Sequence, residues 1–348
     1  MTDIQSLTTQ ELKDLVLSLG DKKYRAEQIF TALHSGKTLS ETSNLPQSLV
    51  GQLLQNFTDK PIDIIKVQKS SDGTQKFLYR LNDGNVIEGV LMQYKFGYTL
   101  CVSTQVGCRM GCKFCASGID GLVRNLTAGE IMGQIICVNH YLGGDIKNRK
   151  VNNIVLMGSG EPLDNYDNTL KFIDLATDKH GLYYSERNIS LSTCGLVPRI
   201  YDLANSGHQI HLCLSLHAPN DDVRHEIMPI SRAYKYEELI DAIKYYSEKT
   251  NRRILIEYTL IAGVNSSRED ALILAKKLKG INCMVNLINL NEVKENDFKR
   301  VSSDVCSTFA SVLQSYKISV TTRRSLGEDI DGACGQLRRK YIKGEDNK

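Results

Sequence analysis

The chain has 348 residues, of which 41% are hydrophobic and 24% are charged, and its formal net charge is +3. This length suffices for one large core and a small accessory domain, and no apolar run approaches the roughly 18 residues of a membrane-spanning helix. The composition is ordinary for a globular protein, and the small net charge decides neither for nor against a nucleic-acid partner.

Residues 1–60 are predicted to form a helical N-terminal accessory domain. Thr8 and Glu11 have the spacing of a capping box, and apolar residues follow at helical intervals until Gly20 ends the helix. A second helix begins with basic residues that could contact phosphate or simply face solvent: Lys22, Lys23 and Arg25.

Residues 61–98 are predicted to form an antiparallel β extension, a short hairpin region that links the helices to the main domain. Three β-rich runs lie here, at Ile64–Lys69, Gln75–Leu81 and Val86–Tyr94. The Ser71-Asp72-Gly73 and Asn82-Asp83-Gly84 segments between them are typical of hairpin turns.

Residues 99–325 alternate short apolar runs with helical patterns, which indicates repeated βα units and therefore an α/β fold with a parallel sheet or barrel. The expected strands are Thr99–Thr104, Asn153–Met157, Ile189–Ser192, Ile210–Leu216, Ile254–Leu260 and Met284–Leu290. Six such units are too few for a full eight-unit barrel. We therefore predict a partial (β/α)6 TIM-like barrel, to which Ile318–Thr322 adds a late strand before the C-terminal segment 326–348.

The N-terminus lacks a basic segment followed by an apolar core, so we expect no signal peptide and a cytoplasmic location. Cytosolic conditions argue against a structural disulfide framework among the 10 cysteines. Cys137, Cys213 and Cys283 lie in apolar stretches, and we expect them to be buried thiols.

Three cysteines, Cys108, Cys112 and Cys115, have the spacing C-x3-C-x2-C. One loop with this spacing can present three thiolates to an iron–sulfur cluster and leave the fourth iron open for chemistry. Gly107 and Gly111 permit the tight turns that such a loop needs. The alternatives are a zinc site, which usually requires four ligands, and buried thiols that bind nothing. The spacing, directly after the first barrel strand, is that of radical S-adenosylmethionine (SAM) enzymes.

Further candidate residues follow the other strands, where βα barrels place their functional groups. Gly158-Ser159-Gly160-Glu161-Pro162 follows the second barrel strand and resembles the glycine-rich, acidic motif that meets the SAM amino group in this superfamily. Ser192, Ser215, His217 and Asn291 also lie at strand ends, although a capping or turn role could explain any one of them.

Nearly the whole chain resembles the RlmN/Cfr family of radical SAM RNA methyltransferases. The resemblance is carried by Gln105–Ser117, Gly121–Thr127, Met157–Leu163, Ser215–Asn220 and Gly332–Leu337. Within the family, RlmN-type enzymes methylate adenine C2 and Cfr-type enzymes methylate C8. Glu161-Pro162-Leu163, Ser192–Pro198 and Ser215–Pro219 favour the RlmN type. Ser159 departs from the pattern, since many members carry Met there.

The resemblance implies a reaction that uses two further cysteines. Cys334, in a glycine-rich segment, would accept a methyl group from one SAM, and a radical derived from a second SAM would activate that methyl for attack on adenine C2. Cys101 would then release the product by forming a transient disulfide with Cys334. Glu88 would accept the C2 proton, although its place on an alternating strand predicts a solvent-exposed side chain. The sequence around Cys101, without the family resemblance, predicts only a buried thiol on a strand.

The resemblance also implies the cofactors and partners. We expect one [4Fe-4S] cluster per chain, two SAM molecules consumed per methylation, a flavodoxin- or ferredoxin-like electron donor, no membrane partner and a monomer. The residues assigned to SAM are Gly160, Glu161, Ser192, Ser215, Leu216, His217 and Asn291.

The expected substrates are a specific adenosine in the peptidyl-transferase region of 23S rRNA and the adenosine 3′ of the anticodon in some tRNAs. Phosphate contacts could come from the basic residues already named and from others near Cys334: Arg323, Arg324, Arg338, Arg339 and Lys340. Tyr24, Tyr94 and Tyr98 could stack on bases, although core tyrosines are commoner.

Three alternatives stay open. The first is a Cfr-type C8 methyltransferase, and the second is a radical SAM enzyme acting on a small molecule or a protein. The third is an iron–sulfur protein that binds RNA without catalysis. The pairing of Cys101 with Cys334 argues against the second.

Overall fold

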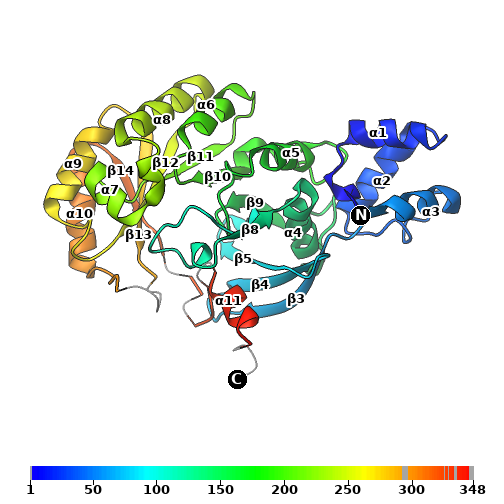
Figure 1. The fold of residues 1–348 in the computed structure, drawn as a ribbon, viewed down its shortest axis with the longest axis horizontal. Coiled ribbons are helices and arrows are strands. Elements are labelled where there is room, and N and C mark those ends of the chain that lie inside the picture. Colours follow the sequence, from blue (N-terminus) through cyan, green and yellow to red (C-terminus); the bar gives the residue numbers. More distant parts are fainter. Residues whose placement is uncertain (1, 292–296, 325, 328, 333–334, 345–348) are drawn as a thin grey trace.

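A mixed sheet of ten strands runs through the molecule, in the order β14-β13-β12-β11-β10-β9-β6-β5-β4-β3 (Figure 1). The computed structural model describes residues 2–291, 297–324, 326–327, 329–332 and 335–344. The strands are β3 (Ile62–Lys69), β4 (Gln75–Leu81), β5 (Val86–Tyr94), β6 (Gly97–Cys101), β9 (Val151–Leu156), β10 (Ile189–Thr193), β11 (His211–Ser215), β12 (Ile254–Leu260), β13 (Cys283–Asn289) and β14 (Ser319–Thr322).

The strands from β6 to β14 pair in parallel and in chain order, which confirms the predicted βα repeat and its late strand. The connecting helices are α4 (Ala128–Tyr141), α5 (Tyr166–Thr177), α6 (Val197–Asn205), α7 (Asp221–Ile227), α8 (Tyr236–Thr250), α9 (Arg268–Leu278) and α10 (Ser303–Ser315). Because parallel strands present their carboxyl ends at one edge, the loops after β6, β9, β10, β11 and β12 converge there.

The predicted antiparallel strands β3, β4 and β5 extend the same sheet, because β5 pairs antiparallel with β6. The first barrel strand is shorter than predicted and ends at Cys101. Beyond it, the backbone of Ser103 exchanges hydrogen bonds with the side chain of Gln134 on α4, at 2.9 Å each, in place of a neighbouring strand. The chain then forms β7 (Gln105–Gly107), which pairs with β8 (Leu122–Asn125) in a separate sheet.

The N-terminal region consists of α1 (Thr9–Ser18), α2 (Tyr24–His34) and α3 (Gln47–Asn56), beside α4 and α5 at one end of the molecule (Figure 1). The predicted capping box of Thr8 and Glu11 is present at α1. Buried side chains such as Phe30 join the same hydrophobic core as Phe172 of α5, so these helices share the core of the barrel. None of the described helices is both long and apolar enough to cross a membrane.

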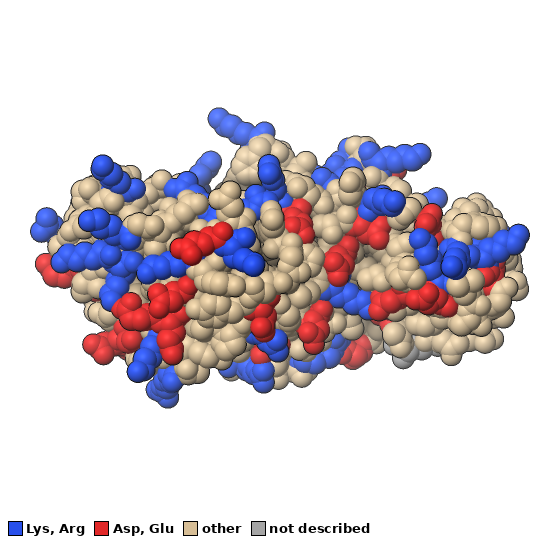
Figure 2. All heavy atoms as spheres, turned by 90° about the horizontal axis from the view of Figure 1, so that it is seen from above, with Lys and Arg blue, Asp and Glu red and all other residues tan. Residues whose placement is uncertain are grey.

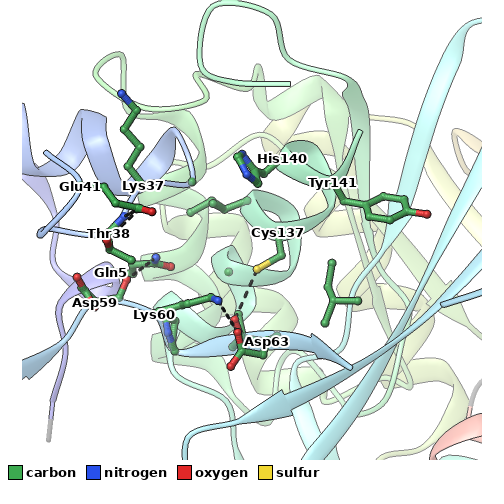
Figure 3. Close-up of a pocket in the computed structure, with 16 residues that line it drawn as sticks. Gln5, Lys37, Thr38, Glu41, Asp59, Lys60, Asp63, Cys137, His140 and Tyr141 are labelled. Carbon is green, nitrogen blue, oxygen red and sulfur yellow. Dashed lines mark hydrogen bonds and ion pairs between the residues drawn. The ribbon is translucent and has the colours of Figure 1, made fainter. Parts of the chain in front are cut away.

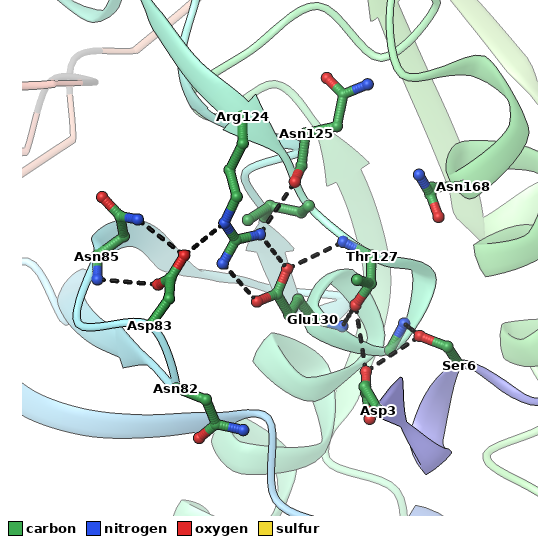
Figure 4. A network of polar contacts seen from close by, with 12 residues as sticks. Asp3, Ser6, Asn82, Asp83, Asn85, Arg124, Asn125, Thr127, Glu130 and Asn168 are labelled. Carbon is green, nitrogen blue, oxygen red and sulfur yellow. Dashed lines mark hydrogen bonds and ion pairs between the residues drawn. The ribbon is translucent and has the colours of Figure 1, made fainter. Parts of the chain in front are cut away.

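A polar network fastens the N-terminal segment to the barrel (Figure 4). Arg124 on β8 contacts Asp83 in the β4–β5 turn at 2.6 Å and both carboxylate oxygens of Glu130 on α4 at 2.7 Å. Glu130 forms a capping box with Thr127, whose hydroxyl donates to Asp3 at 3.2 Å. The network therefore links three regions that are far apart in the sequence.

Asp3 should make the stability of the protein depend on pH. Burial raises the pKa of Asp3 from 3.8 to about 6, although hydrogen bonds from Gln5, Ser6 and Thr127 oppose the shift. The folded state therefore holds this proton more tightly than the unfolded state. The resulting stabilisation is complete below about pH 4 and is lost as the pH rises through about 6.

An Asp3→Asn variant, which stays neutral, should therefore unfold at higher urea concentration than the wild type at pH 7. The expected gain is on the order of 2 kcal/mol, and the gain should shrink towards pH 4.5. Urea denaturation of both proteins at the two pH values measures it. A difference between them that does not change with pH would contradict the assignment.

Candidate active site

The cysteine loop, residues 107–118, follows β7 at the carboxyl edge of the parallel sheet. Cys108, Cys112 and Cys115 are all half-buried on it. The loop is held by backbone hydrogen bonds from Cys108 N to the oxygen of Gly121 and from Cys115 N to the oxygen of Cys112, at 2.9 and 3.0 Å. It is therefore a defined structure that presents three thiols together.

Gly107 is required at the start of this loop. Its φ is +79°, and a Cβ there would lie 2.0 Å from the oxygen of Gly121. No side chain could be accommodated without moving the backbone that bonds Cys108. The prediction that this glycine permits the tight turn is confirmed.

The thiols suit a multi-iron cluster. Burial raises the pKa of Cys108 to about 12, and the nearby Cys115, Glu161 and Asp164 raise it further. Burial likewise raises the pKa of Cys112, helped by its two partner cysteines. Thiols that discourage one another from ionising become thiolates when cations bind them, so the donor set fits a cluster.

The described residues contain no group of His, Cys, Asp and Glu arranged to hold a single metal ion. Thiolates of a cubane cluster bind different irons around its surface, so they do not converge on one point. The predicted cluster and the geometry of the loop are therefore compatible.

Glu161 directly follows Gly160, and its side chain is buried. It accepts hydrogen bonds from Cys194 N at 2.7 Å and Leu163 N at 3.0 Å, while its own N–H donates to Gln105. Burial raises the pKa of Glu161 against the effect of these bonds. Gly160 has φ +109°, and a Cβ there would lie 2.6 Å from the Gln105 side chain. The loop thus fixes a buried carboxylate near the cysteine loop.

Ser159, the departure from the family pattern, is buried between this motif and the cysteine loop. Its hydroxyl lies 3.2 Å from that of Ser117, and its N–H donates to the Ser103 hydroxyl at 3.0 Å. The serine therefore forms a hydrogen bond with the cysteine loop.

Ser192 and Ser215 come together at the ends of β10 and β11, with their hydroxyls 3.1 Å apart. A third residue, which was not predicted from the sequence, joins this group: the buried Glu257 on β12 accepts a hydrogen bond from Ser192 at 3.1 Å. Arg323, just after β14, lies 4.0 Å from Glu257. A charged residue in the middle of the apolar run Ile254–Leu260 was the signal that could have revealed it.

His217 adopts a left-handed backbone with φ 53° and is buried beside the cysteine loop. Its Nδ1 accepts from Thr259 N at 3.0 Å, and its ring meets that of Phe114 edge-on at 4.9 Å. Burial lowers the pKa of His217 to about 3, aided by the positive charge of Arg224. A neutral ring that accepts at Nδ1 carries its proton on Nε2.

The remaining two residues assigned to SAM differ from these. Leu216 is a buried core residue between Ser215 and His217, and its N–H donates to the oxygen of Glu257 at 3.1 Å. Asn291 follows β13 and is exposed. Leu216 can therefore contribute only main-chain atoms or an apolar surface to SAM binding.

Glu88 is buried, with 2% of its surface exposed, so the prediction of a solvent-facing side chain is wrong. Its carboxylate forms an ion pair at 2.8 Å with Lys76, which is 0% exposed. It also accepts from the main-chain N–H groups of Gly335 and, at 3.0 Å, Arg338. The reason for the burial is that α11 (Gln336–Ile342) packs against β5 and covers this end of the strand.

Cys101 is buried at the end of β6, packed with Val90, Met92 and Leu326. The predicted partner, Cys334, lies outside the described residues. Its neighbour Gly335 is described and donates to Glu88, whose strand β5 pairs with β6. The structure therefore brings the chain next to Cys334 to the strand pair that carries Cys101 and Glu88.

Most of the predicted RNA-contacting residues are on the surface, but Arg338 is not. It is buried and its Nε donates to the oxygen of Val86 at 2.9 Å, so its predicted phosphate contact is wrong. Tyr94 and Tyr24 are partly exposed, and Tyr98 packs against the core. On the face shown in Figure 2, Lys and Arg are interspersed with Asp and Glu, so this face is not uniformly basic.

A cavity of about 420 Å³ lies elsewhere, between the N-terminal region, β3 and α4 (Figure 3). Its polar lining includes an ion pair of Lys60 and Asp63 at 2.6 Å. Cys137 lines it, half-buried, and donates to the oxygen of Ile62 at 3.6 Å. This thiol is thus less buried than predicted, whereas Cys213 and Cys283 are buried as predicted. None of the predicted site residues lines the cavity.

Comparison with known proteins gives the class first. Residues 102–275 match the model of the Radical SAM superfamily, so the fold and the cysteine loop define a radical SAM enzyme. A crystal structure of a radical SAM methyltransferase from Sphaerobacter thermophilus superposes with a TM-score of 0.92 at 40% identity, covering 97% of this chain and 99% of that one. This superfamily implies a [4Fe-4S] cluster and SAM.

Curated relatives give the family. A protein of Clostridium botulinum is 49% identical over 350 residues, covering 100% of this chain and 99% of its own length, and one of Clostridium beijerinckii is 50% identical over 344 residues, covering 98% and 96%. Both are named "Probable dual-specificity RNA methyltransferase RlmN". The chain belongs to the RlmN family of dual-specificity RNA methyltransferases.

Proposed function

We propose that this enzyme methylates C2 of a specific adenosine in the peptidyl-transferase region of 23S rRNA, and of the adenosine 3′ of the anticodon in some tRNAs. The membership in the RlmN family supports RNA as the substrate. The observation that carries the finer proposal is the junction of Glu88 with the residue after Cys334. Gly335 bonds to Glu88, whose strand pairs with the strand of Cys101, and this supports a site that Glu88, Cys101 and Cys334 would share.

Cys108, Cys112 and Cys115 would hold one [4Fe-4S] cluster per chain. When bound, the cluster supplies the electron that cleaves SAM to a 5′-deoxyadenosyl radical. An electron donor of the flavodoxin or ferredoxin class would reduce it. The cysteine loop contributes a half-buried set of three thiols, so a four-iron cluster held there would have one iron without a thiolate from this loop.

Glu161, Ser192, Ser215 and His217 would bind SAM, with Gly160, Leu216 and Asn291. A buried carboxylate suits the SAM amino group, and paired hydroxyls suit polar groups of the ribose. Burial of these polar side chains excludes water from the reacting groups.

Cys334, as a thiolate, would take a methyl group from a first SAM by displacement. A second SAM would provide the radical that removes one hydrogen from this methyl, and the resulting carbon would bond to adenine C2. Glu88 would take up the C2 proton, and the radical adduct would return its extra electron to the oxidised cluster. Cys101, as a thiolate, would then attack the bridging sulfur, so that the Cys101–Cys334 bond forms, the carbon–sulfur bond breaks and the released carbon takes a proton from water to become the methyl group. Cellular thiols would reduce the disulfide again. This route is needed because C2 is too electron-poor to attack a SAM methyl directly.

Mapping the methyl group on RNA treated with the reconstituted enzyme tests the proposal. We expect 2-methyladenosine in both 23S rRNA fragments and tRNA. A methyl at C8 would establish the Cfr-type alternative instead. SAM cleavage without RNA methylation would point to a different substrate, and a reduced, cluster-loaded protein that leaves SAM intact would be an RNA-binding protein.

A further inference from the structure

Arg224 is a buried cation to which the scheme above gives no role. It lies on α7 (Asp221–Ile227), and 0% of its surface is exposed. Its Nε and Nη2 donate to the main-chain oxygens of Leu216 and Cys194, at 3.3 and 2.5 Å. Its Nη1 is buried without a hydrogen-bond partner among the described residues. Arginine is almost never fully buried unless its charge is compensated. Asp221, on the same helix, compensates part of this charge, and the unpaired Nη1 leaves room for a further negative charge.

The segment that carries Arg224 supports the cysteine loop from behind. Lys113 N donates to the oxygen of Ile227 at 3.0 Å. Cys112 packs into one apolar cluster with Cys194 and Ile227, the residues next to the guanidinium and at the end of its helix. The cation therefore lies on the apolar side of one of the three cluster cysteines.

Arg224 and Cys112 are linked through Cys194. The main-chain oxygen of Cys194 accepts a hydrogen bond from the guanidinium, and Cys194 packs in the same apolar cluster as Cys112. Arg224 and Cys194 are both buried, and charges interact strongly in such a weakly polar interior.

We propose that Arg224 is the buried countercharge of the iron–sulfur cluster and raises its reduction potential. The inference rests on the proposed cluster at Cys108, Cys112 and Cys115. Three thiolates make such a cluster anionic, and its reduction adds another negative charge. A buried cation stabilises the reduced form more than the oxidised form, and net charge is one of the factors that set cluster potentials. Because Nη1 is enclosed by protein, Arg224 acts through its field and not by touching SAM.

The test compares midpoint potentials of reconstituted holoenzymes by redox titration monitored with electron paramagnetic resonance. Arg224→Gln should lower the equilibrium constant for one-electron reduction at least tenfold, which is about 59 mV. Arg224→Lys keeps the charge and should change this equilibrium constant less than threefold. The matched control is Arg109→Gln, beside Cys108: this side chain is 63% exposed and paired with Asp164, so solvent screens it and the change should be less than threefold.

The other possible outcomes also decide whether Arg224 acts through its charge. A Gln variant with the wild-type potential overturns the proposal, as do equal shifts in the Gln and Lys variants, which would show that the lost hydrogen bonds matter and the charge does not. If Arg224→Gln and Arg224→Met bind no iron while Arg224→Lys loads normally, the countercharge is supported. If all three bind none, the role is structural and the proposal is wrong. A wild type that binds no cluster refutes the proposed function itself.

Discussion

Replacing Cys334 by alanine should abolish RNA methylation, and replacing Cys101 by alanine should leave a covalent protein–RNA species. Without Cys334 the enzyme has no sulfur to carry the methyl group, and direct transfer to C2 is chemically unfavourable. Without Cys101 the methyl can be loaded and joined to the RNA, but no thiol is available to cleave the link. The buried place of Cys101 beside β5 fits this later step.

Denaturing gel electrophoresis with labelled RNA measures the covalent species, and mass spectrometry of peptides measures the methyl on Cys334. Cys137→Ala is the matched control, since this thiol lines the separate cavity and should be dispensable. If both active-site variants methylate RNA at the wild-type rate, the two-cysteine route is wrong.

Glu88→Gln should slow product release by about 10²- to 10⁴-fold, the usual contribution of a positioned base. Methyl loading of Cys334 should continue, so the covalent RNA species should accumulate in this variant too. The two N–H groups of Gly335 and Arg338 bond to different oxygens of Glu88, so the amide can accept from one of them and loses the other bond. Single-turnover assays with preloaded enzyme measure the rate.

The ion pair with Lys76 complicates this variant, because removing one partner of a buried pair costs about 3–5 kcal/mol of stability. The double variant Lys76→Met, Glu88→Gln removes both charges and should recover much of that stability without recovering activity. A double variant with restored methylation would show that Glu88 serves the fold and is not the base.

The strands were predictable because their signals are local. The turn at Asn82-Asp83-Gly84 indicated where β4 ends and β5 begins, and the capping box at Thr8 indicated where α1 begins. The first barrel strand was overestimated because Ser103 looks like a strand residue. Its backbone is instead bonded by Gln134, which is distant in the sequence.

The cysteine loop and the glycine motif were also visible in the sequence, because their function depends on close spacing. The buried charges were not. Glu88 looked exposed because alternation assumes that one face of a strand meets water, whereas α11 covers it. Arg224 lies in a short, highly charged helix that resembles a surface helix. Such charges are buried only because distant elements supply their partners, and no local pattern encodes that.

We expect the methyl group to pass through Cys334 and to lose one hydrogen before it reaches adenine C2. The most direct test supplies the reconstituted enzyme with SAM whose methyl group is fully deuterated and analyses both products by mass spectrometry. We expect 2-methyladenosine that keeps two of the three deuterium atoms, with the third in 5′-deoxyadenosine. A methyl group that retains all three deuterium atoms would mean direct transfer and would contradict a route through Cys334.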